Sequence, residues 1–76
     1  MILKDILKDL IYCDALDPES TLCHIMIDDG HAGIPVASGF AKQSQIKAYN
    51  RRELLWYQIN LFDNTAVFCV EGDLII

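Results

Sequence analysis

Residues 53–70, ELLWYQINLFDNTAVFCV, decide between a mainly helical chain and one built on a β-sheet. Asn50 followed by Glu53 fits a capping box, which would begin a helix here. Against this, large apolar side chains occupy every second position from Leu55 to Leu61, and aromatic and β-branched residues are frequent. Because the side chains of a strand point alternately to its two faces, this spacing favours a strand. The DNT stretch then predicts a tight turn into a second strand, AVFCV.

The N-terminal stretch, MILKDILKDLIY, predicts an amphipathic helix. Apolar pairs recur every four residues at positions 2–3, 6–7 and 10–11, and Lys-Asp pairs separate them. This spacing gathers the apolar residues in one broad stripe and leaves a charged face in solvent. Pro18 disfavours the helical conformation at the residue before it, so the helix is expected to end within DALDPES.

Two more strands are expected in the next part of the chain. In TLCHIMID (21–28), one wholly apolar set of positions alternates with a mostly apolar set, as in a strand. The pair Asp29-Gly30 favours a tight turn, after which IPVASGF (34–40) runs back as another strand. Pro35 has no N–H group to donate to a neighbouring strand, which predicts a position at the edge of the sheet.

These elements together predict an α+β fold in one small domain, residues 1–76. One N-terminal amphipathic helix packs on an antiparallel sheet of four or five strands. Residues 41–52 have no clean period and are expected to form a loop with one helical turn. The EGD stretch (71–73) is expected to turn the chain into a final short strand, LII (74–76).

The chain is apolar for its size. Hydrophobic residues make up 53% of its 76 residues, more than one small core is expected to hide. Exposed apolar patches mark contact surfaces, so we expect a protein partner or a homodimer. No run approaches the ~18 apolar residues of a membrane helix, and acidic residues interrupt the apolar N-terminal segment. We therefore expect a cytoplasmic protein that does not bind membranes.

The formal net charge of −5 argues against direct binding to nucleic acid, because the positive field that neutralises phosphates is missing overall. The charge is unevenly distributed. No acidic residue lies between Gly30 and Arg52. The basic stretch (42–52) contains Lys42, Lys47, Arg51 and Arg52. The basic stretch is either an ordinary solvated face or a local site for an anion or a partner, and both interpretations stay open.

The stretch LCHIMIDDGHAG (22–33) raises the question of a metal site. Zinc takes four Cys or His ligands, but Cys23 and His24 point to opposite faces of a strand and cannot both reach one ion. We expect no metal and no cofactor. The three cysteines, an odd number, are expected to be buried free thiols. Apolar surroundings raise a thiol pKa, whereas a catalytic thiol needs a lowered one, so we expect no catalytic residue and no enzyme.

Surface recognition is the remaining candidate. Trp56 is a natural anchor for a partner, because Trp and Tyr are enriched at interface hot spots; the alternative is a core position. Paired acids beside glycine are either solvated turn residues or contacts to a basic surface. The candidate partner-binding residues are Trp56, Tyr57, Tyr49, Asp28, Asp29, Glu71 and Asp73.

The order LKDLI (7–11), LDPES (16–20), an alternating strand and an Asp-Gly turn resembles small accessory proteins of bacteriophages and other mobile elements. Acidic inhibitors of host defence, such as anti-CRISPR proteins, belong to this group. The resemblance covers roughly residues 3–30, and it assigns no catalytic or binding residue. It implies an accessory role in which the protein acts on a host protein.

The sequence therefore predicts a non-enzymatic accessory protein that binds another protein and masks a basic surface on it. Complementary charge would steer the acidic turns onto that surface. The alternative is a homo-oligomeric subunit that self-associates through its apolar face or through an edge strand, including the C-terminal DLII.

Overall fold

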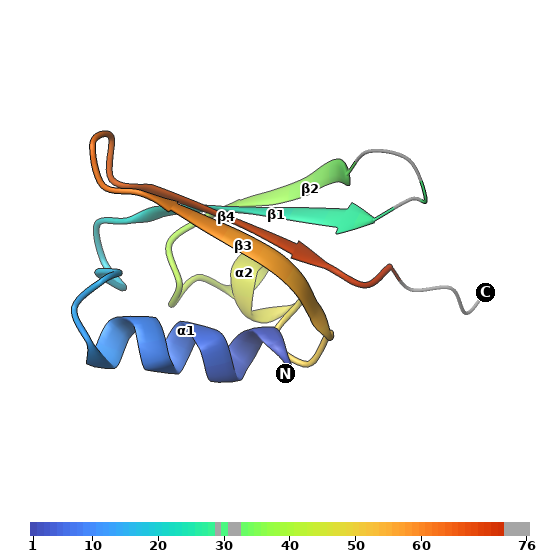
Figure 1. Ribbon diagram of the computed structural model, residues 1–76, viewed down its shortest axis with the longest axis horizontal. Coiled ribbons are helices and arrows are strands. Elements are labelled where there is room, and N and C mark those ends of the chain that lie inside the picture. The colour runs from blue at the N-terminus through green and yellow to red at the C-terminus, as the bar shows by residue number, and fades with distance from the viewer. Residues whose placement is uncertain (29, 31–32, 73–76) are drawn as a thin grey trace.

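The structure is a computed structural model that describes residues 1–28, 30 and 33–72. It shows a twisted sheet with helices on one side (Figure 1). Within these residues the elements are α1 (Leu3–Tyr12), β1 (Leu22–Asp28), β2 (Gly33–Gly39), α2 (Ser44–Lys47), β3 (Leu54–Asn60) and β4 (Thr65–Val70).

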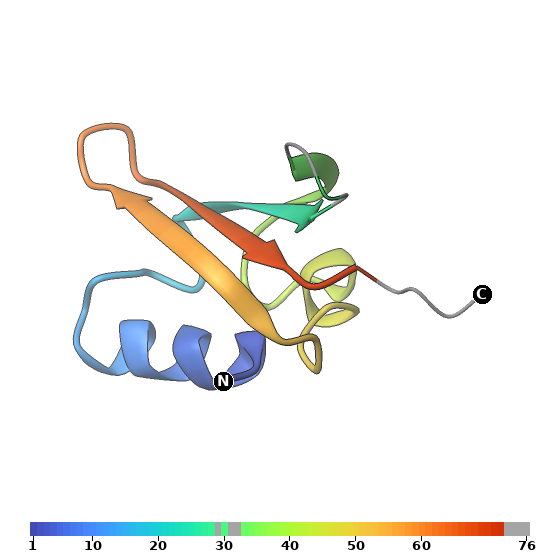
Figure 2. The same cartoon turned by 45° about the vertical axis from the view of Figure 1, so that its right-hand side comes forward.

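The sheet is mixed, and its strand order is β2-β1-β4-β3. The central strands β1 and β4 run parallel, in a register that pairs Leu22 with Thr65 and Ile27 with Val70. Each outer strand pairs antiparallel with the central strand beside it. Because β2 and β3 lie on opposite edges, residues 40–53 must carry the chain from one edge to the other. They do so on the side of the sheet that also holds α1, and α2 lies in this crossing (Figure 2).

The hydrophobic core lies between this helical layer and one face of the sheet. α1 contributes residues spaced three and four apart, which is the spacing of its apolar stripe. The short helix α2 contributes Ile46, whose exposed fraction is 0%. The buried residues of the core are Leu3, Leu7, Leu10, Leu16, Cys23, Ile25, Ala41, Ile46, Ala66, Phe68 and Val70.

The chain leaves the end of α1 through a residue in the left-handed conformation. Asp14 has a φ of 63°, and the backbone N–H groups of Ala15 and Leu16 both donate to the carbonyl oxygen of Leu10, at 2.9 and 3.2 Å. These bonds satisfy a carbonyl at the end of the helix and reverse the chain toward Pro18, as helix C-terminal motifs do.

A polar network holds the beginnings of β1 and β4 together. The Thr21 hydroxyl donates to Asn64 Oδ1 at 2.9 Å and accepts a hydrogen bond from the Asp17 N–H at 2.9 Å. Asn64 Nδ2 donates to the Ser20 carbonyl oxygen at 3.1 Å, and the Leu22 N–H donates to the Asn64 carbonyl oxygen at 3.1 Å. Thr21 is buried, so these bonds supply the partner that a buried polar group needs.

The expected α+β fold is confirmed: one N-terminal amphipathic helix packs on a sheet that has four strands among the described residues. Most of the stretch that begins at Glu53 is the expected strand, which leads into β4, but β3 ends at Asn60, and Leu61 and Phe62 lie in the turn instead of the strand. The loop at 41–52 contains the single helical turn α2. β2 is an edge strand, and Pro35 lies next to an irregularity in its pairing with β1.

Two details differ from the expectations, and a third expectation concerns residues that the structure does not describe. The sheet is not antiparallel throughout, because the central pair is parallel. Cys13 is exposed rather than buried, since it follows the last residue of α1 and lies off the apolar stripe. The expected final strand, LII (74–76), lies outside the described residues.

Two phenylalanines of the same hairpin test this arrangement. Phe68 has an exposed fraction of 0% and Phe62 one of 101%. Phe68→Ala should lower the free energy of unfolding by about 3–5 kcal/mol, because it removes a ring and leaves a cavity. Phe62→Ala, the same chemical change in solvent, should alter it by less than about 0.5 kcal/mol. Urea unfolding followed by circular dichroism measures both, and equal effects would contradict the assigned faces of the hairpin.

Candidate protein-binding surface

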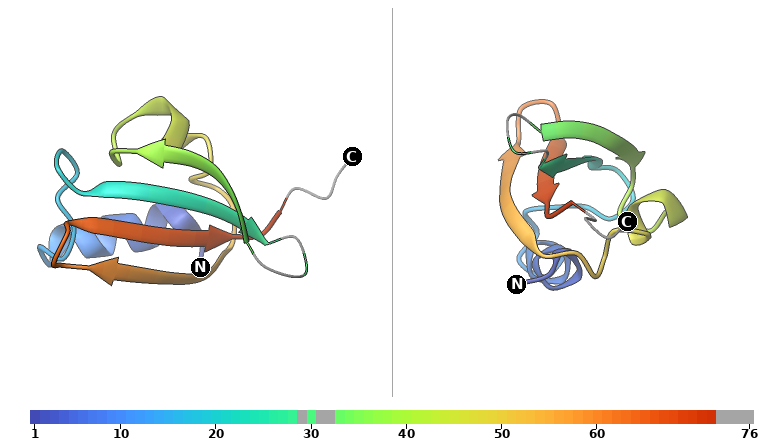
Figure 3. Two further views of the ribbon diagram at one scale, coloured as in Figure 1. Left: turned by 90° about the horizontal axis from the view of Figure 1, so that it is seen from above. Right: turned by 90° about the vertical axis from the view of Figure 1, so that its right-hand side faces the viewer.

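One face of the sheet is left uncovered by the helices. The strand register places Pro35, Met26, Cys69 and Trp56 in one apolar row that crosses all four strands. Seen from above, the strands lie in front of α1, and no described helix crosses them (Figure 3, left). We call this side the open sheet face. It consists of Leu22, His24, Met26, Pro35, Ser38, Trp56, Gln58, Asn60, Thr65, Val67 and Cys69.

The next row of the open sheet face is more polar. It runs from Ser38 through His24 and Val67 to Gln58. His24 Nδ1 and Ser38 Oγ are hydrogen-bonded at 2.9 Å, which orients the imidazole along the sheet. An apolar row bordered by polar groups has the composition of a protein interface, in which a dry centre is surrounded by a polar rim.

Large exposed apolar side chains concentrate on β3 and on the hairpin tip that follows it. Leu55, Trp56 and Tyr57 are each between 41% and 48% exposed. At the tip, Leu61 is 80% exposed and Phe62 projects fully into solvent. The N–H of Phe62 donates to Asn60 Oδ1 at 3.0 Å, so the tip has an internal hydrogen bond that holds the turn. Exposed apolar groups gathered in this way are typical of a contact surface.

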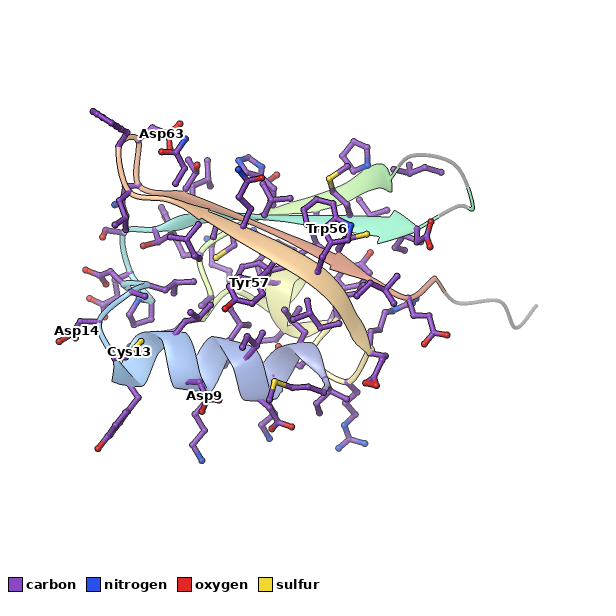
Figure 4. The ribbon with its side chains drawn as sticks, in the orientation of Figure 1. Asp9, Cys13, Asp14, Trp56, Tyr57 and Asp63 are labelled. Atoms are coloured by element: carbon purple, nitrogen blue, oxygen red, sulfur yellow. The ribbon has the colours of Figure 1, made fainter. Side chains whose placement is uncertain are left out.

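The basic residues are confined to one of the two layers of the molecule, where they lie among acidic residues such as Asp5 and Asp9 of α1. None of the four strands contains a Lys or Arg, and the six basic residues of the chain all lie in α1 or in the crossing at 40–53. Acidic residues border the sheet at both ends. Asp28 is the last residue of β1 and Glu71 directly follows β4, so both lie at the carboxyl ends of the central strands. Asp63 lies in the hairpin tip (Figure 4).

The three candidate aromatic residues have different environments. Trp56 lies on the open sheet face, whereas Tyr57 lies on the side of β3 that faces α1 (Figure 4). The Tyr57 ring stacks on Phe68 with a centroid distance of 6.0 Å and an interplanar angle of 21°. Tyr49 is half-buried against the core, and the Arg52 guanidinium lies 5.1 Å from its ring centroid. Trp56 is therefore the aromatic residue of this set that the open sheet face presents.

The acidic candidates lie at one end of the sheet where the structure describes them. Asp28 and Glu71 are both exposed, and the parallel register of β1 and β4 brings them to neighbouring positions. Asp29 and Asp73 lie outside the described residues. The sequence reasoning missed the hairpin tip, Leu61 and Phe62, although two large apolar residues directly before a turn were the signal for it.

Cys23 and His24, the adjacent Cys-His pair of the sequence, do not face one another. Cys23 and His24 lie on opposite faces of β1, with Cys23 in the core, and His31 lies outside the described residues. Among the described residues no group of three or more His, Cys, Asp or Glu side chains could hold a metal ion. Burial raises the pKa of the Cys23 thiol to about 11. Burial, and then the nearby Asp28 carboxylate, raise the pKa of Cys69.

The exposure of the thiols predicts their reactivity. In the native protein at pH 7, Cys13 should react readily with a disulfide reagent, because it is exposed. Cys23 and Cys69 should react only after unfolding in denaturant, since both are buried and their raised pKa values leave little thiolate. The release of reagent chromophore counts the reacting thiols. The Cys13→Ser variant should show no fast phase, and a second fast thiol would contradict the packing described above.

Comparisons with protein-family models, with curated proteins and with solved structures find no match to this chain. The helices add one further finding: within the described residues, none is both long enough and apolar enough to cross a membrane.

Proposed function

We propose that this chain is a non-enzymatic binding protein that docks its open sheet face on another protein and masks a basic surface of that partner. One observation supports this most strongly. No described helix covers the apolar row, in which Trp56 is 48% exposed and Cys69 is buried, and acidic residues lie at both ends of the strands, which contain no Lys or Arg. Such a face combines an apolar centre with a single sign of charge.

The two parts of this surface have different roles in binding. Trp56 and its row supply the free energy, because a large aromatic ring that loses its water on docking is the usual hot spot. Asp28, Glu71 and Asp63 supply orientation and a faster approach, because charges at the rim act mainly on the association rate. A partner that binds nucleic acid through a groove rich in Lys and Arg has the complementary charge.

The resemblance of residues 3–30 to accessory proteins of bacteriophages supports the choice of partner. An acidic protein that covers a nucleic-acid groove competes with the phosphates for the same cations, and it thereby inhibits the partner. We place this activity in the cytoplasm, since an odd number of cysteines does not suit the closed disulfide framework of an exported protein.

Substitutions on the open sheet face test this proposal. The tagged wild-type chain is used to isolate a partner, and the affinity of each variant for it is measured by calorimetry. Trp56→Ala should weaken binding by about 2 kcal/mol or more, because it removes the anchor. The double reversal Asp28→Lys and Glu71→Lys should weaken it about tenfold, because it reverses the charge at one end of the surface.

A matched control uses the same charge change on the other layer. Asp9 is exposed on α1, on the far side of the core from the open sheet face (Figure 4). Asp9→Lys should leave binding within about a factor of two of the wild type. The failure to isolate any partner, or equal effects of the Asp9 and Asp28/Glu71 reversals, would refute the proposal.

Self-association is a second candidate, and the free edge of β3 favours it. The N-terminal residues cover only the beginning of that edge: Ile2 bridges Glu53, and the Leu54 N–H donates to the Met1 carbonyl oxygen at 2.8 Å. Beyond Leu54, no described element pairs with the outer side of β3. An unpaired edge with apolar neighbours is a template for another strand, so two copies could join their sheets around a twofold axis.

The solution mass from light scattering tests whether the chain forms a homodimer. If β3 pairs with its copy, the solution mass should be that of a dimer at high protein concentration. Substitution of the neighbouring tip, Leu61→Ser with Phe62→Ser, should shift the mass toward the monomer, because the dimer would bury these side chains. Tyr12→Ser serves as the control, since Tyr12 is 90% exposed at the end of α1. A monomer at every concentration would exclude this candidate.

A further inference from the structure

A groove lies on the helical side of the molecule, away from the open sheet face. It has a volume of about 350 Å³ and separates α1 from the crossing segment at 41–50. Its lining residues are Lys4, Leu7, Lys8, Ile11, Pro18, Ala41, Lys42 and Asn50. Nothing in the sequence pattern alone points to this groove, because its α1 wall and its crossing-segment wall lie at least thirty residues apart along the chain.

The helix wall of the groove follows from the period of α1. Lys4, Lys8 and Ile11 lie four and three residues apart, so they share one side of the helix, next to the buried Leu7. Long lysine side chains keep the ammonium group in water while the methylene stem covers apolar surface. The wall therefore has an apolar base and a cationic rim.

The opposite wall adds a third cation. Lys42 Nζ lies 3.2 Å from Glu19 Oε2, and both side chains are mostly exposed. An ion pair in such an exposed position contributes little and is readily exchanged. Among the described residues, Lys4 and Lys8 form no ion pair, and no carboxylate lines the groove. Three lysines thus line one apolar depression in a protein whose net charge is −5.

Asn50 provides an independent observation. Its Oδ1 atom is buried and accepts no hydrogen bond within the described part of the chain. Buried polar atoms nearly always have a partner, and one without a protein partner commonly contacts a water molecule or a ligand. Asn50 also lines this groove, so a water molecule held beside it could supply the donor that the atom needs.

We propose that the groove binds a small organic acid with a compact apolar body. The apolar base, formed by Leu7, Ile11, Pro18 and Ala41, takes the apolar body, and the carboxylate lies among the lysine ammonium groups. The volume is at the lower end of the range of ligand pockets, about 300–1,000 Å³, which favours a small molecule over a peptide. This site is separate from the surface of the proposed function, so the two can be tested independently.

The test is a titration of the isotope-labelled full chain with sodium octanoate, below its micelle concentration, followed by the backbone amide signals. Saturable shifts are expected at residues 4–11 and 41–50 and not on β3. The double variant Lys4→Gln and Lys8→Gln should raise Kd about tenfold, since it removes two of the three cations. Octanol, which has the same chain without the charge, should bind about ten times more weakly than octanoate.

Lys47→Gln is the matched control, because Lys47 is an exposed cation on α2 that does not line the groove. It should change Kd by less than about twofold.

Unfolding midpoints of all variants should match the wild type, which keeps a loss of binding separate from a loss of fold. Each of the following results overturns the proposal: no saturable shift, shifts centred on the open sheet face, octanol binding as tightly as octanoate, or equal effects of the lysine variants. Displacement of octanoate by an acidic aliphatic peptide of higher affinity would overturn it in favour of a protein ligand.

Discussion

The parallel pairing of β1 with β4 is the constraint on which the rest of this structure depends. Two strands that lead in the same direction cannot be joined by a hairpin, so the chain must cross the sheet between them. Here the crossing is made by residues 40–53, and each central strand carries its own antiparallel hairpin partner on the outside. The buried Thr21 and its bonds to Asn64 hold the two strands in register at the end where both begin.

This topology also confines the basic residues to one layer of the molecule. The strands are apolar because the two central ones have neighbours on both sides and cover the core. Basic residues are consequently confined to α1 and the crossing, where long side chains can reach water. The result is a sheet layer bordered by acids and a helical layer that holds every lysine and arginine. A small protein with a net charge of −5 can therefore present two chemically different faces.

A chain of 76 residues has a limited interior, and more than half of its residues are hydrophobic. Only part of them enter the core. Others lie in the row that crosses the open sheet face and on β3 and its hairpin tip, and Ile11 lies at the base of the lysine-lined groove. Apolar surface exposed to water is unfavourable, and a partner that covers it lowers the free energy of the system. This is the physical reason to look for partners there.

The sequence by itself determined the elements whose signals are local. The four-residue recurrence of apolar pairs predicts α1, the alternation from Leu55 to Leu61 predicts β3, and the missing N–H of Pro35 predicts an edge strand. Each of these signals depends on residues only a few positions apart. The opposite faces of Cys23 and His24 follow in the same way.

Only the tertiary structure decided how those elements meet. The register joins Leu22 to Thr65, and no periodicity encodes a contact between residues so far apart. That pairing makes the sheet mixed, and the placement of both helices on one side decides which face stays open. The placement of the helices therefore gives two neighbouring aromatic residues different environments: Trp56 is presented to solvent, whereas Tyr57 stacks on Phe68. The groove has the same origin, because its walls come from segments that only the fold brings together.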